Sequence, residues 1–414
     1  MQGTFLGGAG EVGRLGLVLG RAGSRLLLDY GLAPEDPPQY PKPAPPVSAA
    51  LVTHAHLDHA GMMPAIAHES PAPIYGSGPT LDTAELLCQD CLKVHRIEGY
   101  GTPYKDVAVD QMAADARPIR MRSPFTVEDW EIQAENAGHI PGSCMYRLQA
   151  GGSSLMFTGD LNTTESQLVD PAEPIACDTL IMEGTYAGRE HPPRRQTENE
   201  FTQAVRATVE AGGTCVIPAF AVGRTQEVLL VLDEMDIDRP VYIDGMGARV
   251  TELFLRHPYF LKDADRLERV YNDAHRIRGH RMRQQATEPG NIVVTTSGMV
   301  EGGPVITHLK HTHDDPNNSV LLTGYQVEGT GGRRLLDEHR VDLDGEVVNV
   351  NATVDHFDFS GHAGHSELVD FAEGCRPETI VLCHSDEPEL LVDDLESVAE
   401  RVIAPNTGEV FTVP

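Results

Sequence analysis

The chain is poor in lysine and in positive charge as a whole. Its 414 residues include 32 basic and 62 acidic side chains, a net charge of −30 at pH 7, and only five of the basic residues are lysine. Self-repulsion at this charge destabilises a compact state unless salt screens it, and at about 1 M salt the screening length is only about 3 Å. The balance therefore predicts adaptation to molar salt, as in a halophile. It does not exclude a nucleic-acid substrate, because high salt leaves short-range contacts to phosphates as the means of binding.

Long apolar runs are also missing. No stretch of about 18 uncharged apolar residues is present, which excludes a transmembrane helix. The N-terminal segment MQGTFLGGAGEVGR lacks the basic and then apolar pattern of a secretory signal. Hydrophobic residues nevertheless make up 40% of the chain, enough for substantial cores. We expect a cytoplasmic protein of two or three domains.

The seven cysteines are odd in number and stand mostly in apolar surroundings. This pattern is typical of reduced core thiols. Cys88 and Cys91 form a CxxC pair, but they fall in a predicted helix over 79–96 and no second pair exists to complete a zinc site. A redox or zinc role for them is not favoured.

A glycine pattern near the N-terminus could suggest a dinucleotide site. Gly8 to Gly13 fit GxGxxG, and Asp29 follows at a distance suited to a ribose contact. That interpretation requires a helix to begin inside the pattern. The residues over 14–31 instead predict a β-hairpin, so NAD binding is not expected. A further helix is predicted over 197–211.

The strongest chemical signal is HAHLDH at 54–59, directly after the apolar strand ALVT. It supplies four metal-capable side chains within six residues, and imidazole with carboxylate suits zinc, manganese or iron. His139, Asp160 and His384 follow downstream, the last two at the ends of strand-like segments. Each of these alone is more often a cap or a satisfied polar group. Together, five histidines and two aspartates predict a dinuclear metal hydrolase.

These residues, with Asp29, resemble the metallo-β-lactamase fold in order and spacing. The later segments MEGTYAGREHPPR, PAFAVGRTQE, TTSGMVEGGPV, GYQVEGTGGRR and FDFSGHAGHSEL are similar to the β-CASP subfamily of RNA- and DNA-processing nucleases. The similarity is greatest to archaeal homologues of the cleavage and polyadenylation specificity factor nuclease subunit. Because this chain starts at the nuclease domain, it resembles the members without KH domains.

The resemblance implies an α/β fold, in which an αββα metallo-β-lactamase domain is interrupted by an inserted α/β β-CASP domain. The expected divisions are 1–187 for the first part, 188–355 for the insert, and 356–414 for the return to the first domain.

The resemblance also implies the site residues. His54, His56 and His139 would hold one metal ion. Asp58, His59 and His384 would hold the second, with Asp160 bridging. The ions would be zinc, with manganese as the alternative, and would activate a water for attack on phosphorus. Asp29 would orient a ligand histidine from outside.

Two further residues match motifs of the family. His362 would protonate the leaving oxygen, and Glu183 would hold it in position. From the residues alone, Glu183 would be interpreted as a turn cap, and His362 could not be chosen over His365. The acidic residue usual two places after the FSGH histidine is Gly364 here.

Glycine-rich turns in the second half of the chain predict contacts with RNA phosphates. Arg224 stands at a probable helix start, where backbone amides and a guanidinium can bind phosphate. With Ser297, Gly298 and Ser360 it forms the expected phosphate-binding set. The basic stretch HRIRGHRMR over 275–283 could touch RNA or balance nearby acids, and the second interpretation is favoured. Trp130 is the only tryptophan, so little base-specific recognition is expected.

The leading hypothesis is a metal-dependent ribonuclease of RNA processing or decay acting on single-stranded RNA, with internal cleavage favoured. A 5′-to-3′ exonuclease of the same family is the alternative. A non-catalytic scaffold of an RNA-processing complex is less favoured, since all seven predicted ligands are present. A thioesterase or lactonase is also less favoured, because the inserted β-CASP-like domain would then have no purpose. A homodimer stays open: EVFTVP over 409–414 could pair with a partner or finish the chain's own sheet.

Overall fold

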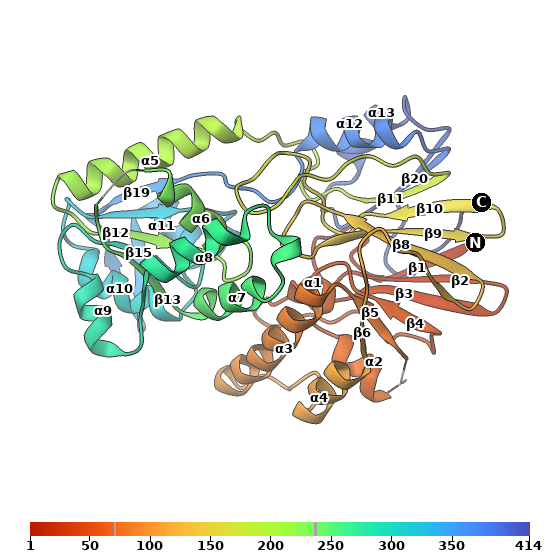
Figure 1. The fold of residues 1–414 in the computed structure, drawn as a ribbon, viewed down its shortest axis with the longest axis horizontal. Coiled ribbons are helices and arrows are strands. Elements are labelled where there is room, and N and C mark those ends of the chain that lie inside the picture. The colour runs from red at the N-terminus through yellow and green to blue at the C-terminus, as the bar shows by residue number, and fades with distance from the viewer. Residues whose placement is uncertain (70–71, 236–237) are drawn as a thin grey trace. The chain divides into compact units, whose positions relative to one another are not determined.

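A computed structural model describes residues 1–69, 72–235 and 238–414 (Figure 1). The chain forms two compact units. The first unit comprises Met1–Thr164, Asp170–Glu190 and Gly361–Pro414, and the second comprises Glu165–Val169 and His191–Ser360. The second unit is therefore an insertion between parts of the first.

The first unit contains a seven-stranded sheet of order β22-β1-β2-β3-β4-β5-β6. Its strands are β1 (Gln2–Gly7), β2 (Gly16–Arg21), β3 (Ser24–Tyr30), β4 (Ala49–Leu51), β5 (Ile74–Gly76), β6 (Ala116–Pro118) and β22 (Val410–Thr412). β2 and β3 are antiparallel neighbours, so the predicted hairpin is confirmed and no helix follows the glycine pattern. β22 pairs antiparallel with β1, which shows that the C-terminal strand completes the chain's own sheet.

A second seven-stranded sheet of order β21-β20-β11-β10-β9-β8-β7 faces the first. Its strands are β7 (Phe125–Val127), β8 (Trp130–Asn136), β9 (Cys144–Ala150), β10 (Ser153–Phe157), β11 (Thr179–Glu183), β20 (Thr379–Cys383) and β21 (Arg401–Ile403). One apolar cluster joins the sheets, with Phe5 and Leu17 from one and Phe157 and Ile181 from the other. The strands alternate inward and outward residues, so each sheet also has an apolar outer face that needs a cover.

Helices provide these covers, which makes four layers. On the first sheet lie α1 (Leu57–Ala60), α2 (Met63–Glu69), α3 (Gly78–Glu98) and α4 (Asp106–Asp115); on the second lie α12 (His365–Cys375) and α13 (Glu389–Leu395). Ile66 and Leu92 pack on Leu27 and Ile74 of the first sheet, and Phe371 lies in the cluster beyond the second. The predicted αββα arrangement is confirmed, and the helix expected over 79–96 is α3.

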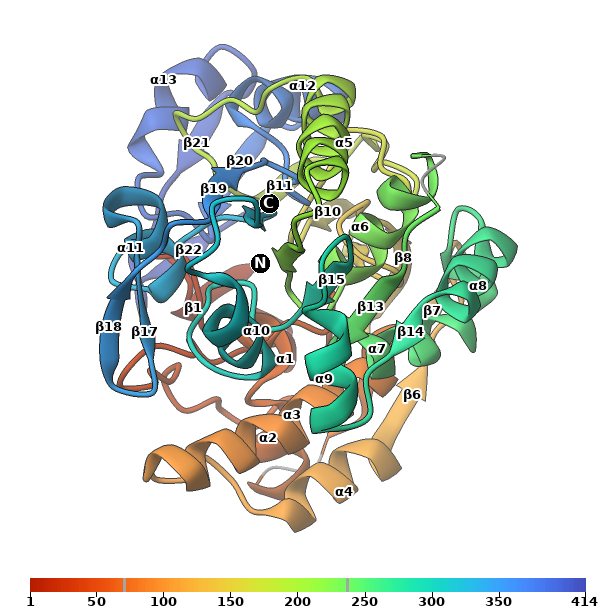
Figure 2. The same cartoon turned by 90° about the vertical axis from the view of Figure 1, so that its left-hand side faces the viewer.

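The second unit is built on a parallel sheet of order β14-β13-β15-β12-β16-β19 (Figure 2). Its strands are β12 (Cys215–Pro218), β13 (Val241–Asp244), β14 (His275–Arg276), β15 (Ile292–Thr295), β16 (Ser319–Leu322) and β19 (Thr353–His356), and β17 (Arg340–Leu343) with β18 (Glu346–Asn349) forms a separate hairpin. Its helices are α5 (Arg194–Glu210), α6 (Arg224–Asp233), α7 (Met246–Leu255), α8 (Ala264–Asp273), α9 (His280–Ala286), α10 (Pro304–Thr312) and α11 (Gly331–Glu338), with a 3₁₀ turn, η1 (Pro258–Phe260). Phe201 of α5 packs with Ile217 and Val294, so the helix expected over 197–211 covers this sheet.

All seven cysteines are buried free thiols, as predicted. Within the described ranges, no helix combines the length and the apolar character needed to cross a bilayer.

Candidate metal centre

The HAHLDH segment follows β4 and turns at once into the short helix α1. Main-chain contacts hold this turn: the amide of Leu15 donates to the carbonyl of Asp58 at 2.8 Å. Gly31 passes so close that a Cβ there would lie 1.7 Å from the same oxygen, so any larger residue would displace the segment. The chain packing therefore fixes the loop that carries four of the predicted ligands.

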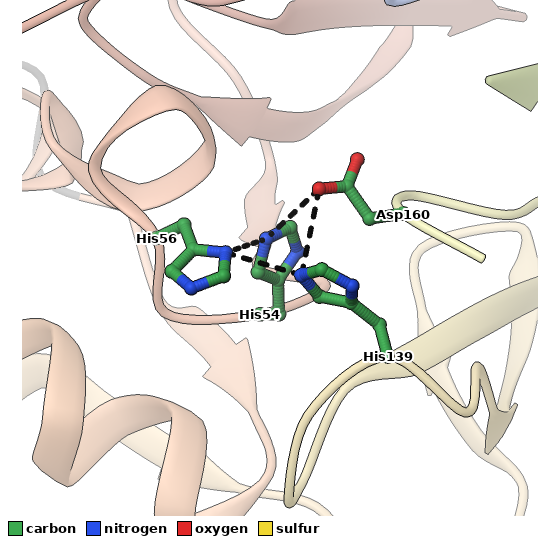
Figure 3. A group of neighbouring side chains, drawn as sticks. All are labelled: His54, His56, His139 and Asp160. Carbon is green, nitrogen blue, oxygen red and sulfur yellow. Dashed lines mark hydrogen bonds and ion pairs between the residues drawn. The ribbon is translucent and has the colours of Figure 1, made fainter. Parts of the chain in front are cut away.

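Asp160 lies at the middle of the predicted ligands, directly after β10. One of its oxygens, Oδ2, lies 3.4 Å from Nε2 of His54 and 3.7 Å from Nε2 of His139. Nδ1 of His56 lies 3.1 Å from each of these two nitrogens. Figure 3 shows the four side chains pointing toward one common space.

The other oxygen of Asp160 faces a second group of donors. Oδ1 lies 3.0 Å from Nε2 of His59 and 3.4 Å from Nδ1 of His384. Nε2 of His384 lies 3.5 Å from Oδ2 of Asp58. A carboxylate with one oxygen toward each group has the arrangement of a bridging ligand, and all seven predicted ligands lie around it.

The arrangement of these nitrogen and oxygen atoms suits coordination of metal ions better than hydrogen bonding among themselves. His59 Nε2, Asp160 Oδ1 and His384 Nε2 are fully buried, yet none has a hydrogen-bond partner among the described residues. Leaving such atoms without a partner costs roughly 1–3 kcal/mol each. Donors bound tetrahedrally at about 2.0–2.2 Å stand roughly 3.3–3.6 Å apart, close to the separations seen here. The cluster therefore suits divalent metal ions held by nitrogen and oxygen.

Asp29 contacts one predicted ligand histidine, His59, directly and a second, His54, through Thr53. Its carboxylate accepts the Nδ1 proton of His59 at 2.8 Å, and the amide and hydroxyl of Thr53, both at 2.7 Å. The Thr53 hydroxyl in turn lies 3.1 Å from Nδ1 of His54, so its oxygen can accept a hydrogen bond from the N–H of that ring. Both rings then keep Nε2 unprotonated toward the centre. Asp29 has a left-handed backbone with φ of 55°, a strained conformation that this network holds in place.

Two other contacts of this kind, to His139 and His384, were not predicted from the sequence. The carbonyl of Gly361 accepts the Nδ1 proton of His139 at 2.6 Å. The hydroxyl of Thr185 lies 3.2 Å from Nδ1 of His384 and 3.3 Å from the carbonyl of the same residue, so it can accept from the ring while donating to the carbonyl. A contact to a backbone carbonyl cannot be predicted from residue type, because every residue has this group. Thr185 could have been suspected only because it follows Glu183 so closely.

Burial and charge give the histidines different proton affinities. Burial lowers the pKa of His54, His56 and His139, which favours the neutral imidazole that binds metal. Burial also opposes charge on His59, but the carboxylates of Asp160 and Asp29 outweigh it and raise the pKa of His59. At His59 a proton and a metal ion would therefore compete for the same nitrogen.

His362 lies beside Asp160 and is held by Glu183. Its Nδ1 lies 3.1 Å and 3.2 Å from the two Glu183 oxygens, and its Nε2 lies 3.8 Å from Oδ2 of Asp160. Burial alone would lower the pKa of His362, but Glu183 and Asp160 together raise it to about 9. His365 is engaged elsewhere, with Nε2 2.8 Å from Asp394. The structure thus distinguishes two histidines that the sequence alone left equivalent.

Glu183 is itself fixed by backbone amides. Its oxygens accept from the amides of Leu161 at 2.6 Å and Thr185 at 3.2 Å, and the side chain is 1% exposed. Glu183 is therefore more than the cap of the turn that follows its strand. It connects His362 to the segment that carries Asp160.

Gly364, where the family usually has an acid, lies at the start of α12. The carboxylate of Glu367 accepts the Gly364 amide at 2.8 Å and also contacts the hydroxyl of Thr164. An acidic group three residues later thus supports the segment that follows His362.

The predicted phosphate-binding residues lie in the second unit. Arg224 is the first residue of α6, as expected. Gly298 passes close to Phe220, since a Cβ there would lie 2.9 Å from its amide, so the structure brings the loop before α6 beside the loop after β15. The Ser297 hydroxyl accepts from the Glu301 amide at 3.1 Å, and the Ser360 amide donates to Asp358 at 3.0 Å.

Three domain families match the chain. A β-lactamase superfamily domain matches residues 25–219, a Beta-Casp domain matches 225–335, and a Zn-dependent metallo-hydrolase RNA specificity domain matches 347–405. These matches follow the order of the segments described above.

Curated relatives are similar over nearly the whole chain. RNase aCSPSF2 of Saccharolobus solfataricus is 34% identical, covering 98% of this chain and 84% of the relative. A probable RNase, MJ4 of Methanocaldococcus jannaschii, is 32% identical over 94% of both chains. The transcription termination factor FttA of Thermococcus kodakarensis is 34% identical over 95% of this chain and 68% of its own length.

A solved structure shares the fold. A protein of unknown function from Enterococcus faecalis V583 superposes with a TM-score of 0.64 over 100% of this chain and 99% of its own, at 14% identity.

Proposed function

We propose a specific activity for this chain, which belongs to the β-CASP family of metallo-β-lactamase-fold ribonucleases: it cuts single-stranded RNA internally, with two zinc ions in the centre around Asp160. The same ligands would accept manganese, because imidazole and carboxylate suit both ions. The proposal assigns one ion to His54, His56 and His139, the other to Asp58, His59 and His384, and the bridging role to Asp160.

Metal ions bound there would supply Lewis-acid stabilisation of charge on the phosphate and would acidify a water. The protein's own contribution is to hold the donors in place. Asp29, Thr53, Thr185 and the Gly361 carbonyl each set the tautomer of a ligand ring, so that no reorganisation is needed when substrate arrives.

His362 is the proposed proton donor to the leaving oxygen. Its Nδ1 proton is directed at Glu183, so Nε2 carries the second proton of the charged ring on the side that faces Asp160. Glu183 stabilises this charged form and fixes the ring orientation. The single observation that carries the proposal is that the paired side chains of Glu183 and His362 lie beside Asp160.

The glycine-rich loops of the second unit are the proposed phosphate contacts. Arg224 at the start of α6 offers a guanidinium beside a helix N-terminus, which attracts phosphate. The hydroxyls of Ser297 and Ser360 and the amide of Gly298 are the further proposed donors. Backbone and hydroxyl contacts of this kind read phosphates and not bases, so weak sequence preference is expected.

Single-stranded RNA labelled differently at its two ends tests the activity. Wild-type protein and His362→Ala are incubated with it in molar KCl, with zinc or manganese. Internal fragments that carry either label, and that disappear with His362→Ala, are expected. Release of the 5′ label as mononucleotides would instead support the 5′-to-3′ exonuclease. Absence of cleavage by folded, metal-loaded protein would contradict the proposal.

A further inference from the structure

The basic stretch over 275–283 is unusual in a chain with a net charge of −30. It holds four arginines and two histidines, and no Asp or Glu occurs from Ala274 to Thr287. It forms β14 at the edge of the parallel sheet and the start of α9, at the left side of the second unit in Figure 1. The sequence favoured charge balance with nearby acids as its role.

One arginine of the stretch does have that structural role. The guanidinium of Arg283 forms a bidentate pair with Asp244, with Nε 2.7 Å and Nη2 3.1 Å from its oxygens. His308 contacts the same carboxylate at 2.9 Å, and Asp244 is 2% exposed. This buried cluster anchors α9 to the end of β13.

A second arginine is also occupied by the fold. The guanidinium of Arg276 lies 4.9 Å from the ring centre of Tyr271, in a cation–π contact. Tyr271 is buried and donates to Glu252 at 2.8 Å. Arg276 therefore packs on Tyr271 at the edge of the sheet.

Arg278 and Arg281 have no such role. Both are exposed, and among the described residues no carboxylate lies within ion-pair distance of either. Some exposed arginines elsewhere have acidic partners: Arg269 pairs with Asp233 at 2.8 Å, and Arg333 with Asp337 at 2.7 Å. Arg278 and Arg281 differ from these because they stand close together in a 14-residue stretch, 274–287, that contains no Asp or Glu, in a chain whose acids are nearly twice as numerous as its bases.

A glycine holds the two arginines on either side of one turn. Gly279 has φ of 122°, a conformation that L side chains rarely adopt, and nothing lies within 4 Å of the position of a Cβ. His280, Gln284 and Gln285 are exposed beside the arginines and offer further hydrogen-bond donors. We name the surface formed by Arg278, His280, Arg281, Gln284 and Gln285 the α9 surface.

We propose that the α9 surface binds RNA backbone phosphates, as a contact additional to the metal centre and the glycine-rich loops. The proposal rests on the proposed ribonuclease function. Arginine suits phosphate because its planar fork donates two parallel hydrogen bonds and stays charged. A protein partner fits less well, since interface cores favour aromatic and apolar groups and none of the exposed large hydrophobic side chains falls between residues 260 and 324.

The salt dependence of RNA binding is the sharpest test. The probe is a uniform 30-nucleotide single-stranded RNA, bound to the full chain in EDTA so that binding is measured without cleavage. The test protein carries Arg278→Gln and Arg281→Gln. The matched control carries Arg96→Gln and Arg269→Gln, which remove the same charge from exposed arginines that have acidic partners, Asp106 and Asp233. Circular dichroism checks the fold at each KCl concentration.

Each phosphate contact to single strands contributes about 0.7 to the slope of log affinity against log salt. The test protein should therefore lose about 1.4 from that slope relative to the control. This corresponds to about tenfold weaker binding at 0.2 M KCl, with the difference vanishing toward 1 M.

The two proposals fail in different ways. If wild-type protein binds RNA with the expected slopes but metal-loaded protein never cuts it, the ribonuclease function fails and the α9 surface stands. If RNA is cut and the slopes of test and control proteins are equal, the α9 surface proposal is overturned. Weaker binding of the test protein to polyglutamate but not to RNA would overturn it in favour of an acidic protein partner.

Discussion

The substitution Asp29→Asn should weaken metal binding without unfolding the protein. In the native network Asp29 only accepts, taking hydrogens from the Thr53 amide, the Thr53 hydroxyl and His59 Nδ1. Asparagine keeps the shape but presents an NH₂ group on one side. If its oxygen keeps the Thr53 amide, the NH₂ faces His59.

The ring of His59 can then accept at Nδ1 only by moving its proton to Nε2. Nε2 is the atom that faces Asp160 at 3.0 Å, so this tautomer presents a proton where a metal ligand is required. Loss of such an outer partner typically costs 10–100-fold in metal affinity, or about 1.4–2.7 kcal/mol. We expect a reduction in this range at the ion held by His59.

The control is Asp178→Asn. Asp178 accepts from the amide of Ser154 at 2.7 Å and from its hydroxyl at 3.0 Å, the same pattern of bonds without a ligand histidine. Competition with a chromophoric zinc chelator measures the affinity, and urea unfolding of metal-free protein measures stability. Folded Asp29→Asn with unchanged zinc affinity would refute the reasoning. An equal loss in both variants would show that the effect is a general weakening of the fold.

Three further predictions concern catalysis, acid stability and packing. His362→Ala should lower kcat about 10²–10⁴-fold while two metal ions per chain stay bound, and loss of an ion would show a structural role instead. Asp244→Asn should destabilise the second unit by about 1–3 kcal/mol at pH 7 in urea unfolding. Burial alone would raise the pKa of Asp244, but contacts with His308 and Arg283 outweigh it and lower this pKa below 3.8. The stability that ionised Asp244 contributes is therefore complete above pH 3.8 and is lost as the pH falls further. The difference in free energy of unfolding between wild type and Asp244→Asn should narrow near pH 3, and a constant difference would contradict this. Phe201→Ala should cost about 3–5 kcal/mol, because the ring is fully buried between Phe357 and Phe359, and a loss under 1 kcal/mol in urea unfolding would contradict it.

The sequence by itself, with the family resemblance its motifs carry, predicted the layers of the fold and the set of candidate metal ligands. Hydrophobic runs bounded by turns predicted the hairpin of β2 and β3 and the helices α3 and α5, because the periodicity of burial is local information. The HAHLDH segment predicted a metal site because four metal-capable side chains stand within six residues.

Only the tertiary structure decided which groups act together. Asp160, Glu183 and His384 are spread over more than 200 residues of sequence, yet they converge because β10, β11 and β20 are parallel neighbours whose carboxyl ends meet at one edge. The role of the Gly361 carbonyl and the occupation of Arg283 but not Arg281 depend on contacts between distant segments. The family resemblance had already selected His362 over His365, and the structure adds the contact of His362 with Glu183. Residue types along the chain carry no record of such contacts, because a hydrogen bond depends on position and direction in space.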